Sequence, residues 1–275
     1  MAAGVPFATH RRNDLPSMTA PTDLLAPPLT PRALLPQRLR ADGFAILGPR
    51  GADGVEGLLG VPLAALEHWR PFWDRLPADG FLRDGGHYRQ RRHGCYIVDG
   101  DRVAAVPHRP HWQPVEYNAR HGGIERRFEP IEPALAADPL WLRWIARLAA
   151  QASALKGAQR WYVEAHPFRI DTTGGIGRPT PEGAHRDGVE LVTVTLMARV
   201  GIKGGETRVF QAQAPEGLRF TLTEPWTTML MDDARVIHES TPIQPLTAAG
   251  GGPQGHRDTL VLTFRAGGFQ GPAGP

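Results

Sequence analysis

The fold class is decided by the stretch Leu191-Val192-Thr193-Val194-Thr195-Leu196-Met197. Four of its seven residues are β-branched, and such side chains favour strands because they pack well on a pleated sheet. Segments of the same character recur at 207–210, 227–231 and 259–264. Turn signals separate them at Gly204-Gly205, at 214–217 and at 250–253. Several short strands joined by loops are typical of a sandwich or barrel.

The rest of the chain adds helices and further strands. Apolar residues fall at helical spacing between 62 and 76, and a second apolar stripe, at 139–155, includes Trp141 and Trp144. Segments 43–47 and 161–170 have the composition of strands. No GxGxxG follows a strand and no GxxxxGK[ST] occurs, so a βαβ nucleotide-binding fold lacks its main support. We therefore predict an α+β, mainly β fold.

Proline and glycine mark the expected domain boundaries. Residues 1–30 sustain no periodic pattern and are interrupted by Leu15-Pro16-Ser17 and Ala26-Pro27-Pro28, so we expect a disordered or loosely docked N-terminal tail. Residues 31–268 are expected to form a single domain, and residues 269–275 a flexible C-terminal tail.

Composition excludes several classes of protein. The chain has 275 residues and one cysteine, Cys95, which can form neither an internal disulfide nor a thiolate metal cluster. No run of about 18 apolar residues occurs and the first 30 residues hold no apolar signal segment, so we expect a cytoplasmic protein without a membrane partner. Lys plus Arg is 31 and Asp plus Glu is 28, and the resulting net charge of +3, spread along the chain, is weak support for a nucleic-acid partner, so we expect none.

Metal chemistry is indicated by His185-Arg186-Asp187 together with His238. An H-x-D can place both side chains on one face of a strand end, because strand side chains alternate with a period of two. If His238 lies on a neighbouring strand, two imidazoles and one carboxylate converge and leave three positions open, as in non-haem Fe(II) oxygenases. H-x-D alone is also compatible with a surface histidine beside an aspartate.

A cation for a cosubstrate is expected on the last strand. Oxygenases of this type usually bind 2-oxoglutarate, whose far carboxylate matches the planar fork of an arginine. Arg257 opens the predicted strand and Arg265 ends it, and counting by twos places both on the face that carries Val261. We favour Arg257 because it is closer in sequence to His238; Arg265 is the alternative.

Longer motifs around these residues resemble a known family. Residues Pro181-Glu182-Gly183-Ala184-His185-Arg186-Asp187-Gly188 look like the metal-binding strand of the bacterial 2-oxoglutarate/Fe(II) dioxygenase family that includes L-isoleucine hydroxylase. Further similar segments are Gly204-Gly205-Glu206-Thr207, 238–243, Arg257-Asp258-Thr259-Leu260, 117–124 and 127–131. The resemblance extends from about residue 40 to residue 265.

The resemblance implies a double-stranded β-helix (jelly-roll, cupin-like) core flanked by helices. It implies Fe(II) held by His185, Asp187 and His238, with 2-oxoglutarate on Arg257 and O2 as the oxidant. It also implies an oxidoreductase that hydroxylates an aliphatic carbon of a free L-amino acid or close derivative, with succinate and CO2 as co-products. Two alternatives stay open: the same chemistry on another small metabolite or a peptidyl residue, or a non-catalytic jelly-roll metal-binding or sensor protein.

A zwitterionic substrate needs a cation for its carboxylate and an acceptor for its ammonium group. We rank Arg169 first because it lies on a predicted strand shortly before the H-x-D, then Arg127, with Glu116 as an acceptor. Further candidates are Arg89, Arg91, Glu129 and Asp171. Glu206 is expected to brace the metal site through its ligands. All of these charges can instead be solvated surface groups, and the irregular spacing of His108, His111 and His121 predicts no second metal site.

Overall fold

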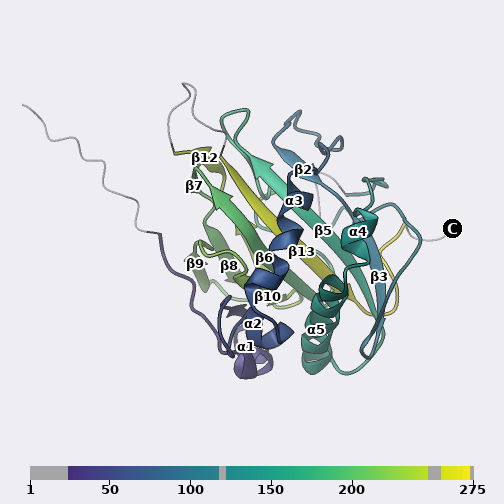
Figure 1. The fold of residues 1–275 in the computed structure, drawn as a ribbon. Helices are drawn as coiled ribbons and strands as arrows, with labels where there is room; N and C mark the ends of the chain where they lie inside the picture. Colours follow the sequence, from purple (N-terminus) through teal and green to yellow (C-terminus); the bar gives the residue numbers. More distant parts are fainter. Residues whose placement is uncertain (1–23, 118–121, 247–254, 273–275) are drawn as a thin grey trace, which may run out of the picture.

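The computed structural model describes residues 24–117, 122–246 and 255–272, and its largest element is an eight-stranded antiparallel sheet (Figure 1). Neighbouring strands follow the order β1-β10-β6-β13-β5-β3-β4, and β2 also pairs with β5. Their bounds are β1 Phe44–Leu47, β10 Thr228–Asp232, β6 Leu191–Val200, β13 His256–Arg265, β5 Trp161–Asp171, β3 Gly94–Asp99, β4 Arg102–Ala105 and β2 Arg89–Arg91. The strands predicted at 191–197, 259–264 and 161–170 are therefore confirmed.

Two smaller sheets complete the β core. One has the order β11-β8-β9, and the other is the pair β12-β7. Their bounds are β11 Val236–Ser240, β8 Thr207–Gln211, β9 Gly217–Phe220, β12 Ile243–Pro245 and β7 Ile202–Gly204. Val209, Phe220 and Val236 pack against Val192 and Met229 of the large sheet in one buried cluster. The fold is thus mainly β with a jelly-roll core, as the sequence predicts.

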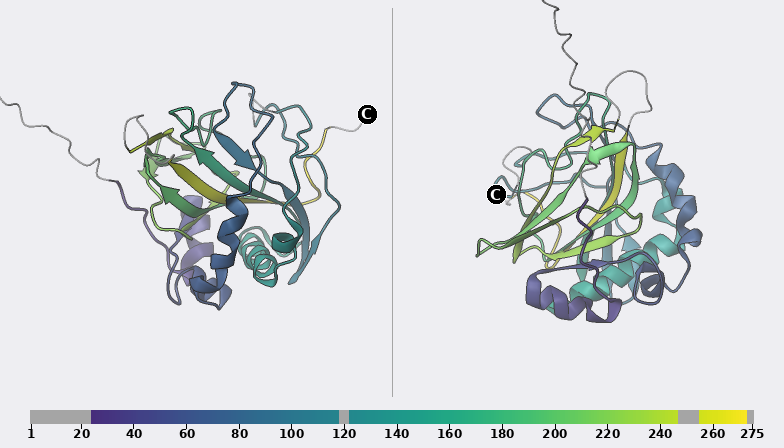
Figure 2. Two further views of the ribbon diagram at one scale, coloured as in Figure 1. Left: turned by 45° about the horizontal axis from the view of Figure 1, so that its top comes forward. Right: turned by 90° about the vertical axis from the view of Figure 1, so that its left-hand side faces the viewer.

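Helices cover the other face of the large sheet, as the right-hand view of Figure 2 shows. Their bounds are η1 Arg32–Leu34, α1 Leu35–Asp42, α2 Val55–Leu59, η2 Leu63–Trp69, α3 Arg70–Trp73, α4 Pro133–Ala136 and α5 Pro139–Lys156. The Asp138 side chain caps α5 by accepting hydrogen bonds from the main-chain N–H groups of Leu140 and Trp141. Among the described residues, no helix has both the length and the apolar character that a membrane crossing needs.

The segment between 62 and 76 is less regular than its apolar spacing indicates. It forms the 3-10 helix η2 and then the single turn α3, rather than one continuous α-helix. Pro71 stands in the middle of the segment, where its missing N–H removes one α-helical hydrogen bond. The predicted helical character is confirmed, but the hydrogen-bonding pattern changes within it.

Alternation along β13 separates the core from the site. Leu260, Leu262 and Phe264 are fully buried in the cluster beneath the helices. Arg257 and Val261 point to the opposite face, into a cavity between the sheets. One strand therefore supplies both the packing that fixes its position and the side chains that line the site.

The described parts of the two predicted tails contact the domain. The main-chain N–H of Thr221 donates to the Leu25 carbonyl, and that of Thr30 donates to the Ile46 carbonyl. At the other end, the Gln270 side chain donates to the Asp187 and Gly188 carbonyls. Residues 1–23 and 273–275 lie outside the described part of the chain.

Candidate functional site

Three predicted metal ligands meet at one end of the jelly roll. His185 and Asp187 lie just before β6, and His238 lies in the middle of β11. The ligand atoms of these three side chains all lie within 4.8 Å of one another. His185 Nε2 is 3.9 Å from Asp187 Oδ1, and His238 Nε2 is 4.0 Å from Asp187 Oδ2. The predicted convergence of two imidazoles and one carboxylate is present in the structure.

Hydrogen bonding orients the first ring for metal binding. His185 Nδ1 lies 2.9 Å from the Gly183 carbonyl, an acceptor, so Nδ1 carries a proton and Nε2 is the nitrogen that faces the other two ligands. Burial, with His185 nearby, lowers the pKa of His238 well below its usual value, so that ring is neutral. Burial opposes the charged form of His185, but Asp187 and Glu182 raise the pKa of this ring above its usual value. A bound cation would favour the neutral ring, and two imidazoles with one carboxylate form a donor set that fits Fe(II).

Asp187 is held from two sides. The Gln113 side-chain amide donates to Asp187 Oδ1 at 3.1 Å. The main-chain N–H groups of Asp187, Gly188 and Val189 donate to the Asp233 carboxylate at 3.0, 2.7 and 3.1 Å. Burial raises the pKa of Asp187 to about 6; the carboxylates nearby add to the shift and His185 opposes it. A bound cation would favour the charged form of this carboxylate.

The triad opens into a cavity that Arg257 also lines. Polar lining residues are Arg89, Arg91, His111, Gln113, Arg126, His166, Thr180, Glu182, His185, Asp187, His238, Ser240, Arg257, Thr259 and Thr263. Apolar lining residues are Phe168, Ile170, Pro179, Val194, Met229 and Val261. The predicted triad and the predicted cosubstrate arginine thus share one enclosed space.

Arg257 and Arg265 occupy different places. Arg257 is 4% exposed, its Nε has no hydrogen-bond partner, and no carboxylate of the described residues lies within ion-pair distance of it. Burial, with Arg199 nearby, lowers the pKa of Arg257 to about 10. Arg265 instead donates to the Gly268 carbonyl at 2.7 Å and lines a separate small hollow. A buried, unpaired guanidinium is a receptor for an anion, and of the two candidates only Arg257 has that character.

The cavity has three further arginines that differ in their partners. Arg89 pairs with Asp79, at 2.7 Å between Nε and Oδ2. Arg91 Nη2 lies 2.7 Å from His166 Nδ1, and Arg126 Nη2 donates to Gln113 Oε1 at 2.7 Å. Arg89 is therefore matched by a carboxylate, whereas neutral groups hold the other two.

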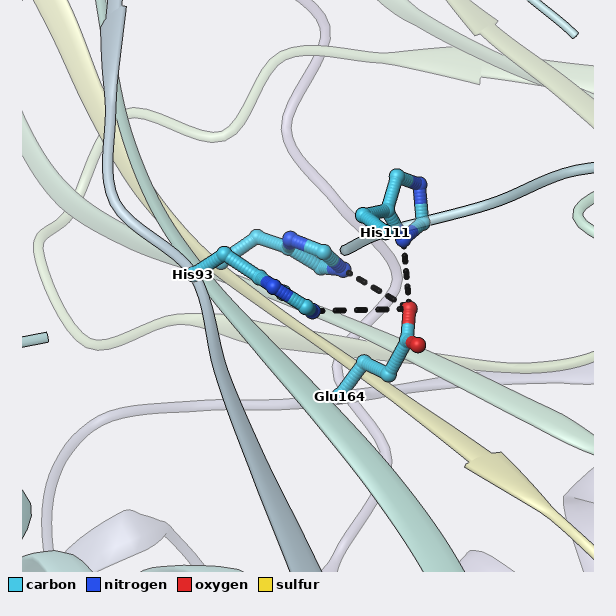
Figure 3. Close-up of side chains that lie close together, drawn as sticks. His93, His111 and Glu164 are labelled. Carbon is cyan, nitrogen blue, oxygen red and sulfur yellow. Dashed lines mark hydrogen bonds and ion pairs between the residues drawn. The ribbon is translucent and has the colours of Figure 1, made fainter. Parts of the chain in front are cut away.

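A second group of ligand-type residues lies beside the cavity: His93, His111, Glu164 and His166, all buried. Figure 3 shows the imidazoles of His93 and His111 directed at the Glu164 carboxylate. The distances to Glu164 Oε2 are 2.5 Å from His111 Nδ1 and 3.7 Å from each of His93 Nε2 and His166 Nε2. The sequence predicted no second metal site and named only His111 of this group; the fold of β5, the residue before β3 and a loop brings the four side chains together.

The first-ranked substrate candidates, Arg169, Arg127 and Glu116, lie outside the cavity lining, whereas Arg89 and Arg91, which the sequence also offered, line it. Arg169 pairs with Asp258 and Asp74, at 2.7 and 2.8 Å, on the opposite face of β5. Arg127 and Glu116 are exposed. Strand and loop alternation explains the difference, because Phe168 and Ile170 on either side of Arg169 are the residues that face the cavity.

Glu206 also has partners away from the metal ligands. Its carboxylate pairs with Arg208 at 2.9 Å and lies 4.0 Å from Arg219. The bracing contacts expected of Glu206 are made instead by Asp233 and Gln113. Asp233 stands in the turn after the strand at 228–232, but a turn aspartate carries no sequence signal for this contact.

Comparison with known proteins decides the family. The model of the 2OG-Fe dioxygenase family matches residues 70–263, more than half of the chain. The chain belongs to the 2OG-Fe dioxygenase family. Members of this family use Fe(II), 2-oxoglutarate and O2, so this dioxygenase is an oxidoreductase.

Solved structures agree with that assignment. A bsmA homolog from Methylobium petroleophilum PM1 is 52% identical, with a TM-score of 0.83, and the match covers 90% of this dioxygenase and 98% of that chain. IDO from Bacillus thuringiensis is 18% identical, with a TM-score of 0.63, and the match covers 84% of this dioxygenase and 93% of that chain. The Fe(II)/α-ketoglutarate-dependent dioxygenase TqaL is 18% identical, with a TM-score of 0.64, and the match covers 85% of this dioxygenase and 86% of that chain. The last two share the fold. No curated protein matches this sequence.

Proposed function

We propose that His185, Asp187 and His238 hold the Fe(II) and that Arg257 holds the far carboxylate of 2-oxoglutarate. The observation that carries this proposal is the shared cavity: a converging triad and a buried arginine without a carboxylate partner line one space. The Nδ1–H group of His185 is directed at the Gly183 carbonyl, so Nε2 is the nitrogen that faces the metal position. When bound, the iron with 2-oxoglutarate and O2 supplies the oxidation of a C–H bond.

We further propose that the substrate is a free L-amino acid or close derivative, hydroxylated at an aliphatic carbon with release of succinate and CO2. This is the L-isoleucine hydroxylase branch of the family that the sequence resembles. The apolar lining supports an aliphatic side chain, since Val194, Met229 and Val261 can contact it. The protein's own residues bind and orient both organic molecules and exclude water from the reacting carbon.

The test combines a spectrum with a product assay. Fe(II) and 2-oxoglutarate added without oxygen should produce a weak visible charge-transfer band, and a screen of free L-amino acids with oxygen should find one or more that release succinate. Absence of the band in iron-loaded protein would contradict the metal and cosubstrate assignment. A band without succinate release for any free amino acid would leave the oxygenase intact and contradict the substrate class.

A further inference from the structure

Arg91 is a buried cation that forms no ion pair with a carboxylate of the described residues. It lies on β2 at 4% exposure, and its guanidinium stands between the rings of Phe128 and Phe168, at 3.7 and 4.3 Å from their centroids. Its side chain hydrogen-bonds to His166, and no carboxylate of the described residues lies within 4.0 Å of it. The two aromatic faces hold the guanidinium plane in place without neutralising it.

The hydrogen bond from Arg91 determines the state of His166. A guanidinium can only donate, so His166 Nδ1 accepts and the ring proton sits on Nε2, which faces Glu164 at 3.7 Å. Glu164 Oε2 also lies 2.5 Å from His111 Nδ1, so the negative charge of Glu164 is directed at imidazoles rather than at Arg91. Burial lowers the pKa of His166 well below its usual value, which keeps the ring neutral.

The same hydrogen bond argues against a second metal among these histidines. A metal on His166 Nε2 would require a proton on Nδ1, where Arg91 already presents a donor. His93 Nδ1 is buried and has no hydrogen-bond partner, so it lacks the acceptor that usually orients a ligating histidine. The group His93, His111, Glu164 and His166 has the donors of a metal site but not the supporting contacts.

Arg126 is a second cation of the same kind. It is 2% exposed, its Nη2 donates to the neutral Gln113 amide oxygen, and its Nε has no partner. Gln113 in turn donates to Asp187. Both unmatched arginines therefore line the cavity of the triad, and one of them is linked to a metal-ligand carboxylate through a single side chain.

The acceptor for an ammonium group is Glu182. It lines the same cavity, and its Oε2 is buried without a hydrogen-bond partner. Its Oε1 lies 3.5 Å from His185 Nε2, which places it beside the triad. Two unmatched cations and one unmatched carboxylate oxygen facing one space are complementary to a molecule that carries a carboxylate and an ammonium group.

We propose that Arg91 and Arg126 bind the substrate carboxylate, that Glu182 binds its ammonium group, and that the neutral His166 positions Arg91 for this task. The inference rests on the proposed function, because it divides the same cavity into a cosubstrate end at Arg257 and a substrate end at Arg91 and Arg126. It specifies a free α-amino acid with an uncharged, aliphatic side chain. A peptidyl residue lacks both charged groups and is excluded by this assignment.

The first experiment uses L-isoleucine, L-leucine, L-valine and L-methionine with their carboxamides and N-acetyl derivatives. Each is added to the anaerobic protein with Fe(II) and 2-oxoglutarate, and binding is read from the change in the visible band. At least one free amino acid should bind, and its carboxamide and N-acetyl derivative should bind at least tenfold more weakly. Equal binding of the derivatives, or no binding by any of the four acids, overturns the inference. Failure of the band to form at all contradicts the proposed function instead.

The second experiment uses variants of matched shape. Arg91→Gln should raise the amino-acid KM at least tenfold and leave the cosubstrate KM unchanged. His166→Asp places a carboxylate against Arg91 and should have a similar effect, whereas His166→Asn, whose side chain is isosteric with aspartate but uncharged, should raise the amino-acid KM far less. Thermal melting checks that each variant folds. Equal effects of Asp and Asn, or two tightly bound metal ions per chain with one lost in Glu164→Gln, would overturn the positioning role.

Discussion

His185 and His238 exchange both of their main-chain hydrogen bonds, with each N–H donating to the other's carbonyl at 3.0 Å. This antiparallel bridge joins the loop before β6 to the middle of β11 and brings the two ring centroids to 4.6 Å. The backbone, rather than the imidazoles, makes the connection. Side-chain substitutions at these two positions can therefore remove a ligand while the bridge stays in place.

We expect His185→Ala, Asp187→Ala and His238→Ala each to abolish the Fe(II)·2-oxoglutarate band and turnover. Each change removes one of three protein ligands, and two are too few to hold iron in this geometry. Anaerobic absorbance and succinate release measure the two effects. Glu206→Gln is the control, because Glu206 pairs with Arg208 and should leave the band intact. Normal turnover by Asp187→Ala would show that iron binds elsewhere.

The two arginines of β13 should differ in their effect on the cosubstrate. Arg257→Ala removes a buried guanidinium, and hydrogen bonds to charged groups contribute about 1.5–3 kcal/mol, so the cosubstrate KM should rise about 10- to 100-fold. Arg257→Lys keeps the charge but not the planar fork, so its cosubstrate KM should lie between those of the unchanged protein and of Arg257→Ala. Arg265→Ala should leave this KM unchanged, since Arg265 binds the Gly268 carbonyl. The reverse result would assign the carboxylate to Arg265.

Local sequence patterns predicted the strands, and together with the longer motifs they predicted that His185, Asp187 and His238 converge. The β-branched run at 191–197 and the strand at 259–264 carry their own signal, and the H-x-D places two ligands within three residues. Sequence also predicted which side chains of a strand share a face where one face is apolar. Arg257 and Val261 both lie on the cavity face of β13, as counting by twos predicts.

The sequence ranked Arg169 and Arg127 above the arginines that line the cavity, for a physical reason. Residues 163–167 of β5 are all buried, so period-two alternation gives no sign of which face is the cavity. Arg169 is offset by one position from Phe168, and that offset directs its side chain to Asp258. Arg127 is offset in the same way from the buried Arg126. Sequence located segments that border the cavity, but a one-residue difference in facing exchanges a side chain that lines the cavity for one that points away from it.

Gln113 should govern how well Asp187 holds iron. Gln113→Leu removes the donor to Asp187 Oδ1 and the acceptor for Arg126, both of which lie in the interior. Loss of such a contact typically costs 10- to 100-fold in metal affinity, so we expect a drop of about that size in Fe(II) affinity. Titration of the visible band with Fe(II) measures it, and melting of the metal-free protein separates it from misfolding. An unchanged Fe(II) affinity would mean that Asp233 alone fixes Asp187.

Acid should destabilise the protein through its buried histidines. Burial lowers the pKa of His111 to about 4, from an ordinary value of 6.5. The depressed pKa means that, between pH 6.5 and 4, His111 binds a proton in the unfolded chain but not in the folded one. The free energy of unfolding is therefore unaffected by His111 above pH 6.5 and falls through this residue as pH decreases from 6.5 towards 4. The slope for one such group is about 1.4 kcal/mol per pH unit.

His111→Gln isolates this contribution, because glutamine keeps a polar side chain that does not titrate. Urea unfolding of the metal-free protein at pH 7.5, 6.5, 5.5 and 4.5 should give a free energy of unfolding that falls less steeply in the variant, by about 1.4 kcal/mol per pH unit below 6.5. The remaining slope belongs to other groups, including His93 and His166, whose pKa values burial also lowers. Parallel curves for the two proteins would mean that His111 takes up its proton in the folded state, and the neutral imidazole arrangement around Glu164 would then be wrong.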